Sequence, residues 1–152
     1  IMNASWDDGT KIIMHDHIHI GVAVDTKRGL LVPVIRDADQ KSLEEIHQAM
    51  EEIKEKSPKG NFSMEDLSGG TFVISNLGMF NIHAFSAIVN APNGAIISVG
   101  KMEEVPIVKN GEIVIGKTMK IALNMDHRVI DGATGARFLT ALVERLENLG
   151  KE

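Results

Sequence analysis

The pair Asn110-Gly111 constrains the fold of this chain more than any other short segment. Both residues accept positive φ, as the two central positions of a type I′ turn require. Strand-like stretches flank the pair, from Val105 to Val108 and from Glu112 to Ile115. We therefore predict a β-hairpin here, followed by another strand from Met119 to Met125, so that the second half of the chain is rich in β-structure.

Strand patterns also occur earlier in the chain. The run from Ile18 to Asp25 is β-branched and partly alternating, and Gly29 marks a turn into residues 30–35. Pro33 restricts that second run to a sheet edge or a bulge, because proline has no N–H to donate. Residues 71–75 predict a further strand that ends at Ser75.

Two helices are predicted. Ser42 with Glu45 three residues later forms a capping-box pattern, and the helix that it begins should end near Ser57, before Pro58. A second helix should begin at Asp131. Each carries an apolar stripe: Leu43, Ile46, Met50 and Ile53 in the first, and Leu139, Leu142, Val143, Leu146 and Leu149 in the second. Strands and helices without strict alternation predict an α+β fold, a two-layer α/β arrangement with helices packed on a mixed sheet.

Composition excludes several classes of protein. The formal net charge is −5 and no Lys/Arg cluster occurs, which argues against nucleic-acid and anionic-membrane partners. No apolar run reaches the roughly 20 residues that cross a bilayer. The absence of cysteine removes disulfides and thiolate chemistry, so we expect a cytoplasmic protein, or one of the mitochondrial matrix if the source is eukaryotic.

The segment Asp126-His127-Arg128-Val129-Ile130-Asp131-Gly132 is the strongest functional signal. Histidine is neutral and proton-accepting near pH 7, and the end of a strand is where such a side chain can meet a substrate. This predicts a general base. The alternative is structural: Asp131 would be the N-cap of the following helix and His127 a surface turn residue.

The same segment resembles the signature of the dihydrolipoyl acyltransferase component of 2-oxoacid dehydrogenase complexes. Three motifs follow the family's order: residues 21–35, residues 69–80 and residues 126–132. The resemblance implies a chloramphenicol acetyltransferase-like fold and a homotrimer, within a cubic or icosahedral core, whose active sites lie between two subunits. The implied reaction transfers an acyl group between dihydrolipoamide and coenzyme A.

The resemblance also implies roles for individual residues. His127 would be the general base, Ser75 would stabilise the tetrahedral oxyanion, and Asp131 would orient the base's surroundings. Arg128 could pair with Asp131 or with another acid. A nucleophilic triad of Ser75, His127 and Asp131 has suitable residue types for hydrolysis, but the Gly-x-Ser-x-Gly pattern is absent around Ser75.

Coenzyme A is implied as a substrate, with contacts from Asp25, Ser75, Asn76 and Gly100. The sequence has no Gly-rich phosphate loop that would identify a nucleotide site independently. The lipoyl group would be carried on another domain. His15, His17 and His19 would stack on one face of an extended strand, too widely spaced for one ion, so we expect no metal site.

The chain as a whole, residues 1–152, reads as the C-terminal part of the catalytic domain, with the lipoyl and subunit-binding domains absent. The 2-oxoacid decarboxylase and dihydrolipoyl dehydrogenase components would be partners through those missing domains. Residues 75–80 and 85–92 look more like the acetyl-transferring pyruvate branch than the branched-chain branch. The competing hypothesis is a non-catalytic structural core subunit, against which the retention of His127 argues.

Overall fold

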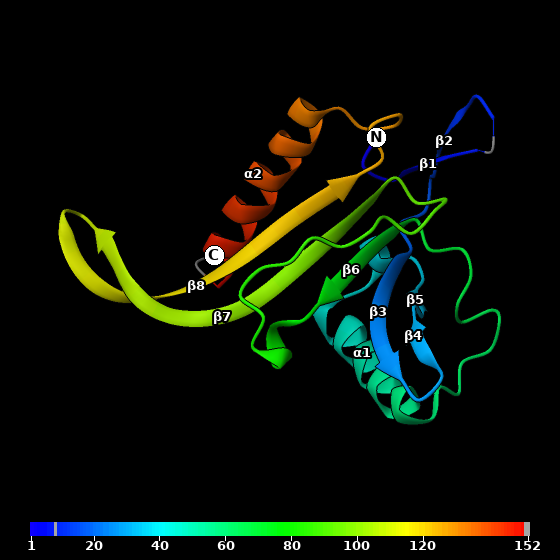
Figure 1. Cartoon of the computed structure of the whole chain (residues 1–152), viewed down its shortest axis with the longest axis horizontal. Helices are drawn as coiled ribbons and strands as arrows, with labels where there is room; N and C mark the ends of the chain where they lie inside the picture. The colour runs from blue at the N-terminus through cyan, green and yellow to red at the C-terminus, as the bar shows by residue number, and fades with distance from the viewer. Residues whose placement is uncertain (8, 151–152) are drawn as a thin grey trace.

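The computed structural model describes residues 1–7 and 9–150. Its strands are β1 (Ala4–Trp6), β2 (Ile12–Met14), β3 (Ile20–Thr26), β4 (Gly29–Leu31), β5 (Val34–Ile35), β6 (Phe72–Asn76), β7 (Ala95–Lys109) and β8 (Glu112–Met125), and its α-helices are α1 (Leu43–Lys56) and α2 (Gly132–Asn148). Short 3₁₀ turns occupy residues 38–40, 57–59 and 78–80. A six-stranded mixed sheet has the order β4-β3-β6-β7-β8, with β5 also paired to β3, and β1 and β2 form a separate hairpin (Figure 1). The α+β prediction is confirmed.

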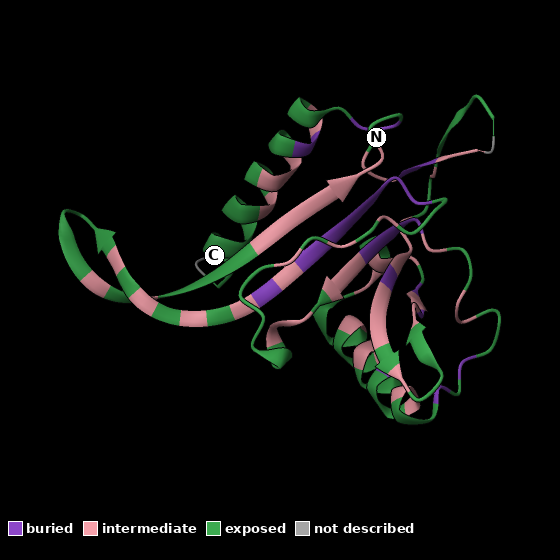
Figure 2. Cartoon of the chain, in the orientation of Figure 1, coloured by how far each residue is buried: buried purple, intermediate pink, exposed green. Residues whose placement is uncertain are grey.

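The long hairpin of β7 and β8 is the most extended part of the molecule (Figure 1). Asn110 and Gly111 have φ values of 53° and 83°, which confirms the predicted turn between the two strands. The strands are much longer than predicted, and β8 joins the stretches from Glu112 to Ile115 and from Met119 to Met125. We call residues 102–119 the arm; its residues are exposed or half-buried (Figure 2), since little of the described chain covers it.

Helix α1 has the predicted capping box. The Ser42 side chain accepts a hydrogen bond from the Glu45 backbone N–H at 3.2 Å, and the Glu45 carboxylate accepts one from the Ser42 backbone N–H at 2.7 Å. The helix ends at Lys56, as predicted. Its buried residue Ile53 packs in one hydrophobic cluster, whose buried members are Ile35, Ile53 and Phe62.

Helix α2 covers a second cluster, in which Phe138 and Leu142 pack against buried strand and loop residues. The predicted helix is confirmed, but its apolar stripe is only partly covered: Val143 and Leu146 remain exposed, and Leu149 lies beyond the helix end. Within the described residues, neither helix is long and apolar enough to cross a membrane. The buried members of the cluster that α2 covers are Ala4, Phe72, Ala95, Ile97, Val129 and Ile130.

Replacing Ile130 by alanine should destabilise the protein by about 2 to 5 kcal/mol, because its side chain is 1% exposed and the truncation would leave a cavity. Urea unfolding measures the loss. Leu43→Ala is the matched control, since Leu43 is 78% exposed on α1 and its truncation should change stability by no more than about 0.5 kcal/mol. Equal losses for the two variants would contradict the assignment of Ile130 to the core.

Candidate active site

Ser75 is the second-last residue of β6, a strand held by parallel pairing on both sides. It lies between Ala23 of β3 and Ser98 of β7 in the register of the sheet. The residue is half-buried, and its hydroxyl makes no hydrogen bond to any part of the chain that the structure describes. Next to it, the Asn76 side-chain oxygen accepts a hydrogen bond from the Gly78 backbone N–H at 2.8 Å, which turns the chain away from the strand. Ser75 is therefore a rigidly placed hydroxyl that is free to donate to a ligand.

A cleft of about 460 Å³ opens beside Ser75. Its walls include Asp25, Ser75 and Asn76, so the fold brings together three of the four residues predicted to contact coenzyme A. Gly100 is not part of this lining. It is buried in β7, where a Cβ atom would overlap the carbonyl oxygen of His83, so its role is to let two backbone segments pass closely.

The cleft also has walls that sequence reasoning did not find. These apolar side chains come from β4, from α1 and from the turn after β6: Leu30, Met50, Ile53, Met79 and Phe80. Met50 and Ile53 belong to the apolar stripe of α1, which was recognisable in the sequence. The stripe did not reveal that Met50 and Ile53 would border a cleft as well as pack in the core.

His127 lies in the turn that follows β8, exposed to solvent. Its imidazole has no hydrogen-bond or ion-pair partner among residues 1–7 and 9–150. The neighbouring Arg128 pairs with Asp126 rather than with Asp131, with 2.6 Å between Arg128 Nη2 and Asp126 Oδ2. Hydrogen bonds from Arg128 lower the pKa of the Asp126 carboxyl to about 2.

Asp131 is the N-cap of α2, as the structural alternative predicted. Its Oδ1 atom accepts a hydrogen bond from the Thr134 backbone N–H at 2.9 Å, and Oδ2 accepts one from the Thr134 hydroxyl at 2.6 Å. These hydrogen bonds lower the pKa of the Asp131 carboxyl. In the described part of the chain the carboxylate has no recorded bond to His127, so its orienting role stays a prediction.

Ser75 and His127 lie apart within one chain. Ser75 is level with Ser98, which is level with Ala122 of β8, and β8 runs three residues further to Met125 before the turn that carries His127. Two strand spacings across the sheet and three residues along it amount to roughly 14 Å even at Met125. One chain therefore does not bring the two groups to a shared reacting atom.

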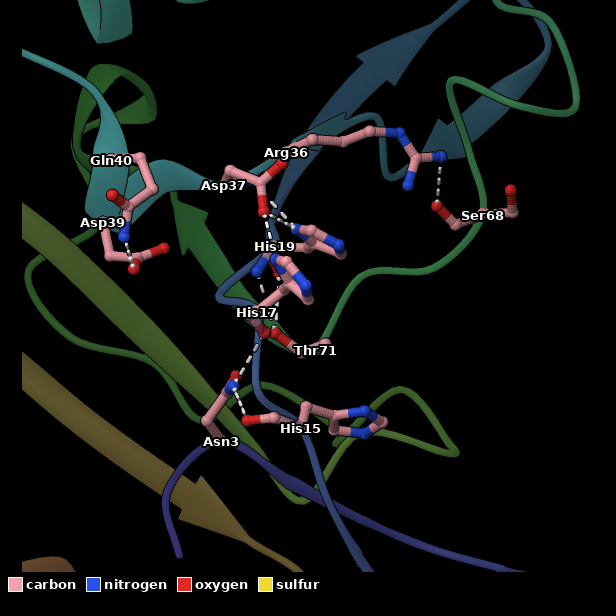
Figure 3. A network of polar contacts seen from close by, with 10 residues as sticks. All are labelled: Asn3, His15, His17, His19, Arg36, Asp37, Asp39, Gln40, Ser68 and Thr71. Carbon is pink, nitrogen blue, oxygen red and sulfur yellow. Dashed lines mark hydrogen bonds and ion pairs between the residues drawn. The ribbon is translucent and has the colours of Figure 1, made fainter.

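The prediction that His15, His17 and His19 stack on one strand face is confirmed only in part (Figure 3). The His17 and His19 rings stack with their centroids 5.8 Å apart, but His15 is not part of the stack and the three residues precede β3, which begins at Ile20. His17 Nδ1 lies 2.8 Å from Asp37 Oδ1, and His19 Nδ1 accepts a hydrogen bond from the Asp37 backbone N–H at 2.9 Å. His15 Nε2 contacts the Ser5 hydroxyl instead, at 2.9 Å. Within the described residues, no group of three metal-binding side chains comes together.

The fold and the motifs can now be compared with known proteins. The family model of the 2-oxoacid dehydrogenases acyltransferase catalytic domain matches residues 1–151, so the chain belongs to that family. The prediction of an acyltransferase catalytic domain is thereby confirmed.

Particular relatives lie in two branches of the family. The dihydrolipoyllysine-residue acetyltransferase component of the pyruvate dehydrogenase complex of Rickettsia felis is 40% identical over 146 residues, which is 96% of this chain and 35% of that protein. The succinyltransferase component of the 2-oxoglutarate dehydrogenase complex of Pseudomonas aeruginosa is 44% identical, over 97% of this chain and 36% of that protein. The chain thus spans about a third of the length of these relatives.

Solved structures of the family have the same fold. The dihydrolipoamide acetyltransferase of Azotobacter vinelandii, studied for the role of a serine, a histidine and an asparagine in its catalytic mechanism, has a TM-score of 0.92 and 40% identity. It matches 97% of this chain and 61% of that chain. The cubic core of a pyruvate dehydrogenase multienzyme complex has a TM-score of 0.91 and 39% identity, with the same coverage.

Proposed function

We propose that this protein transfers an acyl group between dihydrolipoamide and coenzyme A, with His127 as general base and Ser75 as oxyanion donor. One observation carries the proposal. The chain belongs to the acyltransferase family, and Ser75 precedes His127 by the same number of residues that separates the catalytic serine and histidine named for the Azotobacter vinelandii enzyme. Asp131 follows His127 by four positions, as the asparagine follows the histidine in that enzyme.

The chemistry needs one base and one donor. A thiol with a pKa of about 8.5 is mostly protonated at pH 7, so the His127 imidazole removes the proton from the attacking sulfur of coenzyme A. The sulfur attacks the thioester carbonyl of the acylated dihydrolipoyl group, and the Ser75 hydroxyl donates to the negative oxygen of the tetrahedral intermediate. Collapse of the intermediate breaks the other carbon–sulfur bond, and the imidazolium returns its proton to the departing dihydrolipoyl sulfur.

Asp131 has a different part. A carboxylate accepts hydrogen bonds but cannot donate one, and both of its oxygens are engaged by Thr134. We therefore assign it to holding the start of α2, which fixes the far end of the turn that carries His127. A direct exchange of protons between Asp131 and His127 is no part of the proposal.

The cleft beside Ser75 is proposed to receive the thiol end of coenzyme A. Its volume of about 460 Å³ and its largely apolar walls suit the aliphatic arm of that molecule, and Asp25 and Asn76 supply polar groups at the rim. Gly100 lies outside the cleft lining, and its predicted contact with coenzyme A stays a proposal. The acylated lipoyl group would be delivered by a separate lipoyl domain, and the partner enzymes of the complex would bind outside these residues.

A complete site requires a second copy of the chain. Ser75 and His127 are too far apart within one chain, and β8 is an edge strand whose outer side is open in the described residues. The arm also exposes apolar side chains that water would penalise in a single chain, with Val108, Ile113 and Ile115 all at least 75% exposed. We propose a homotrimer in which one copy supplies Ser75 and its neighbour supplies His127, as the subunit of a larger core.

Mixing two inactive variants tests this arrangement. Ser75→Ala and His127→Ala subunits, coexpressed in equal amounts, should form mixed trimers in which about one quarter of the sites combine an intact serine from one copy with an intact histidine from its neighbour. Acetyl transfer from acetyl coenzyme A to dihydrolipoamide should recover to about that fraction of the wild-type rate, since each site needs one group from each copy. If one chain supplied both groups of each site, the mixture would stay inactive. The same assay tests the competing hypothesis of a purely structural subunit. If that hypothesis held, the wild-type protein itself would transfer no acyl group.

For the acyl group we propose acetyl. The support is the resemblance of residues 75–80 and 85–92 to the pyruvate branch, because the acetyltransferase and succinyltransferase relatives are about equally identical to this chain. A higher kcat/KM for acetyl coenzyme A than for succinyl coenzyme A is expected. A higher kcat/KM for succinyl coenzyme A would instead assign the protein to the 2-oxoglutarate branch. The roles proposed for His127 and Ser75 would be unchanged.

A further inference from the structure

A salt bridge brackets His127. The residues before and after it, Asp126 and Arg128, form a bidentate pair, in which Arg128 Nη2 donates to Oδ2 at 2.6 Å and Nε donates to Oδ1 at 2.9 Å. The Arg128 backbone N–H also donates to Asp126 Oδ1, at 3.0 Å. With a further bond from Nε to Oδ2 at 3.1 Å, four hydrogen bonds join the residues on either side of His127. Such charge-assisted pairs have a narrow range of geometries.

The salt bridge is attached to a second element. The Arg128 guanidinium lies over the Trp6 ring of β1, 5.0 Å from its centroid. Trp6 is itself held, because its backbone N–H donates to the Pro92 carbonyl oxygen at 3.2 Å. The indole thus gives the guanidinium a fixed platform that comes from another part of the chain.

The backbone of the turn is anchored on both sides of His127. The Asp126 N–H donates to the Gly94 carbonyl at 2.8 Å, and the Asp126 carbonyl accepts from the N–H groups of Val129 and Ile130 at 2.9 Å each. The side chains of Val129 and Ile130 are buried in the core. His127 is therefore the exposed residue of a turn whose neighbouring residues are held by hydrogen bonds or by burial. Its own imidazole makes no hydrogen bond or ion pair within the described chain.

We propose that Asp126, Arg128 and Trp6 are positioning residues that hold the His127 imidazole in the orientation the reaction needs. This inference rests on the proposed role of His127 as the base. We call the three residues the clamp. They act through His127 and are not proposed to touch substrate.

The clamp should matter for rate far more than for stability. Ion pairs near the surface contribute little to folding, and the Asp126 and Arg128 side chains are 19% and 60% exposed. A base displaced by about 1 Å can lose about 10²-fold in rate. The pair also stays ionised at any practical assay pH, because the pKa of Asp126 is lowered to about 2 and the pKa of Arg128 is raised.

The test uses the assembled protein and separates kcat from KM. Arg128→Gln and Trp6→Leu should each lower kcat for acetyl transfer by about 10²-fold, with the KM for acetyl coenzyme A close to wild type. The melting temperature of Arg128→Gln should also stay close to wild type, whereas Trp6→Leu should lower it, because Trp6 packs against the buried cluster under α2. Arg128→Lys keeps the positive charge but loses the two parallel N–H donors of the guanidinium, and Trp6→Phe keeps an aromatic face. Both variants should therefore lose less kcat than Arg128→Gln and Trp6→Leu. Arg145→Gln, an exposed arginine of α2, is the matched control and should behave as wild type.

A double-variant cycle with His127→Ala distinguishes positioning from a general structural effect. In that background Arg128→Gln should cause no further loss, since the group that the clamp positions is gone. An equal further loss there, or a kcat for Arg128→Gln within a few-fold of wild type, would overturn the clamp while leaving the proposed function intact. A fully active His127→Ala variant would instead overturn the base assignment, and the clamp with it.

Fluorescence gives a readout that is independent of activity. Trp6 is the single tryptophan among the 152 residues, so its emission in this chain reports on the guanidinium above it. Arg128→Gln should shift that emission and Arg145→Gln should not. In wild type the signal should be constant above about pH 4 and change as the pH falls through about 2, because Asp126 then becomes protonated. An emission spectrum unaffected by Arg128→Gln would show that the stack is absent.

Discussion

His127→Ala is expected to lower kcat for acetyl transfer by about 10²- to 10⁴-fold, because a positioned base contributes about that factor when a thiol must lose its proton. The KM for acetyl coenzyme A should change little, since the imidazole is exposed at the end of a turn and does not line the cleft beside Ser75. Steady-state kinetics with dihydrolipoamide as acceptor measures both constants. The rate should rise again at high pH, where the thiol ionises without help.

The control for this variant is His47→Ala. His47 is an exposed histidine of α1 that lies outside the cleft lining, so its loss should leave kcat unchanged. The folded state of the His127 variant should match that of wild type, because the side chain has no recorded partner in the described chain. A kcat within a few-fold of wild type at neutral pH would remove His127 from the mechanism.

Ser75→Ala has the second-largest expected effect. The loss of one well-aimed hydrogen-bond donor to an oxyanion costs about 10²- to 10³-fold in kcat. The hydroxyl is half-buried at the end of a strand held on both sides and has no partner in the described chain, so its removal should leave the fold unchanged. Pre-steady-state kinetics should show the slower step as acyl transfer rather than product release.

Two comparisons sharpen the serine prediction. Ser68→Ala removes an exposed loop hydroxyl and should have no effect on transfer. If Ser75→Ala raised the KM for coenzyme A without lowering kcat, then Ser75 would bind substrate in the cleft and would not stabilise the transition state. An acyl group attached covalently to Ser75 would support the nucleophilic triad in its place.

The turn and the helix caps of this protein were predictable from the sequence, because residues close together in the chain determine them. The Asn110-Gly111 turn depends on the φ values of two adjacent residues, and the α1 cap depends on Ser42 and Glu45 bonding to each other's backbone. The capping role of Asp131 belongs to the same class, because its partner is only three residues away. In each case the interacting groups lie within one turn of chain, so distant residues have little influence.

Predictions that depended on distant contacts were less accurate. His17 and His19 stack as their spacing predicted, but His15 contacts Ser5 instead, and none of the three belongs to a strand. The arm is far longer than its hairpin signal indicated, because two strand segments merged when β7 provided one continuous partner. The close passage of residue 83 against Gly100 was not foreseen, and the contact predicted between Gly100 and coenzyme A stays a prediction.

The sequence by itself determined the residue types of the site, the motifs that indicate the family, and the capped helices and tight turn, since these need only short-range bonding. Only the tertiary structure decided which side chains meet. The register of β6, β7 and β8 places Ser75 and His127 apart in one chain, and the packing of β1 brings Trp6 over Arg128. The physical reason is that sheet register and the packing of distant segments sum many weak contacts over the whole chain, and no short segment contains that information.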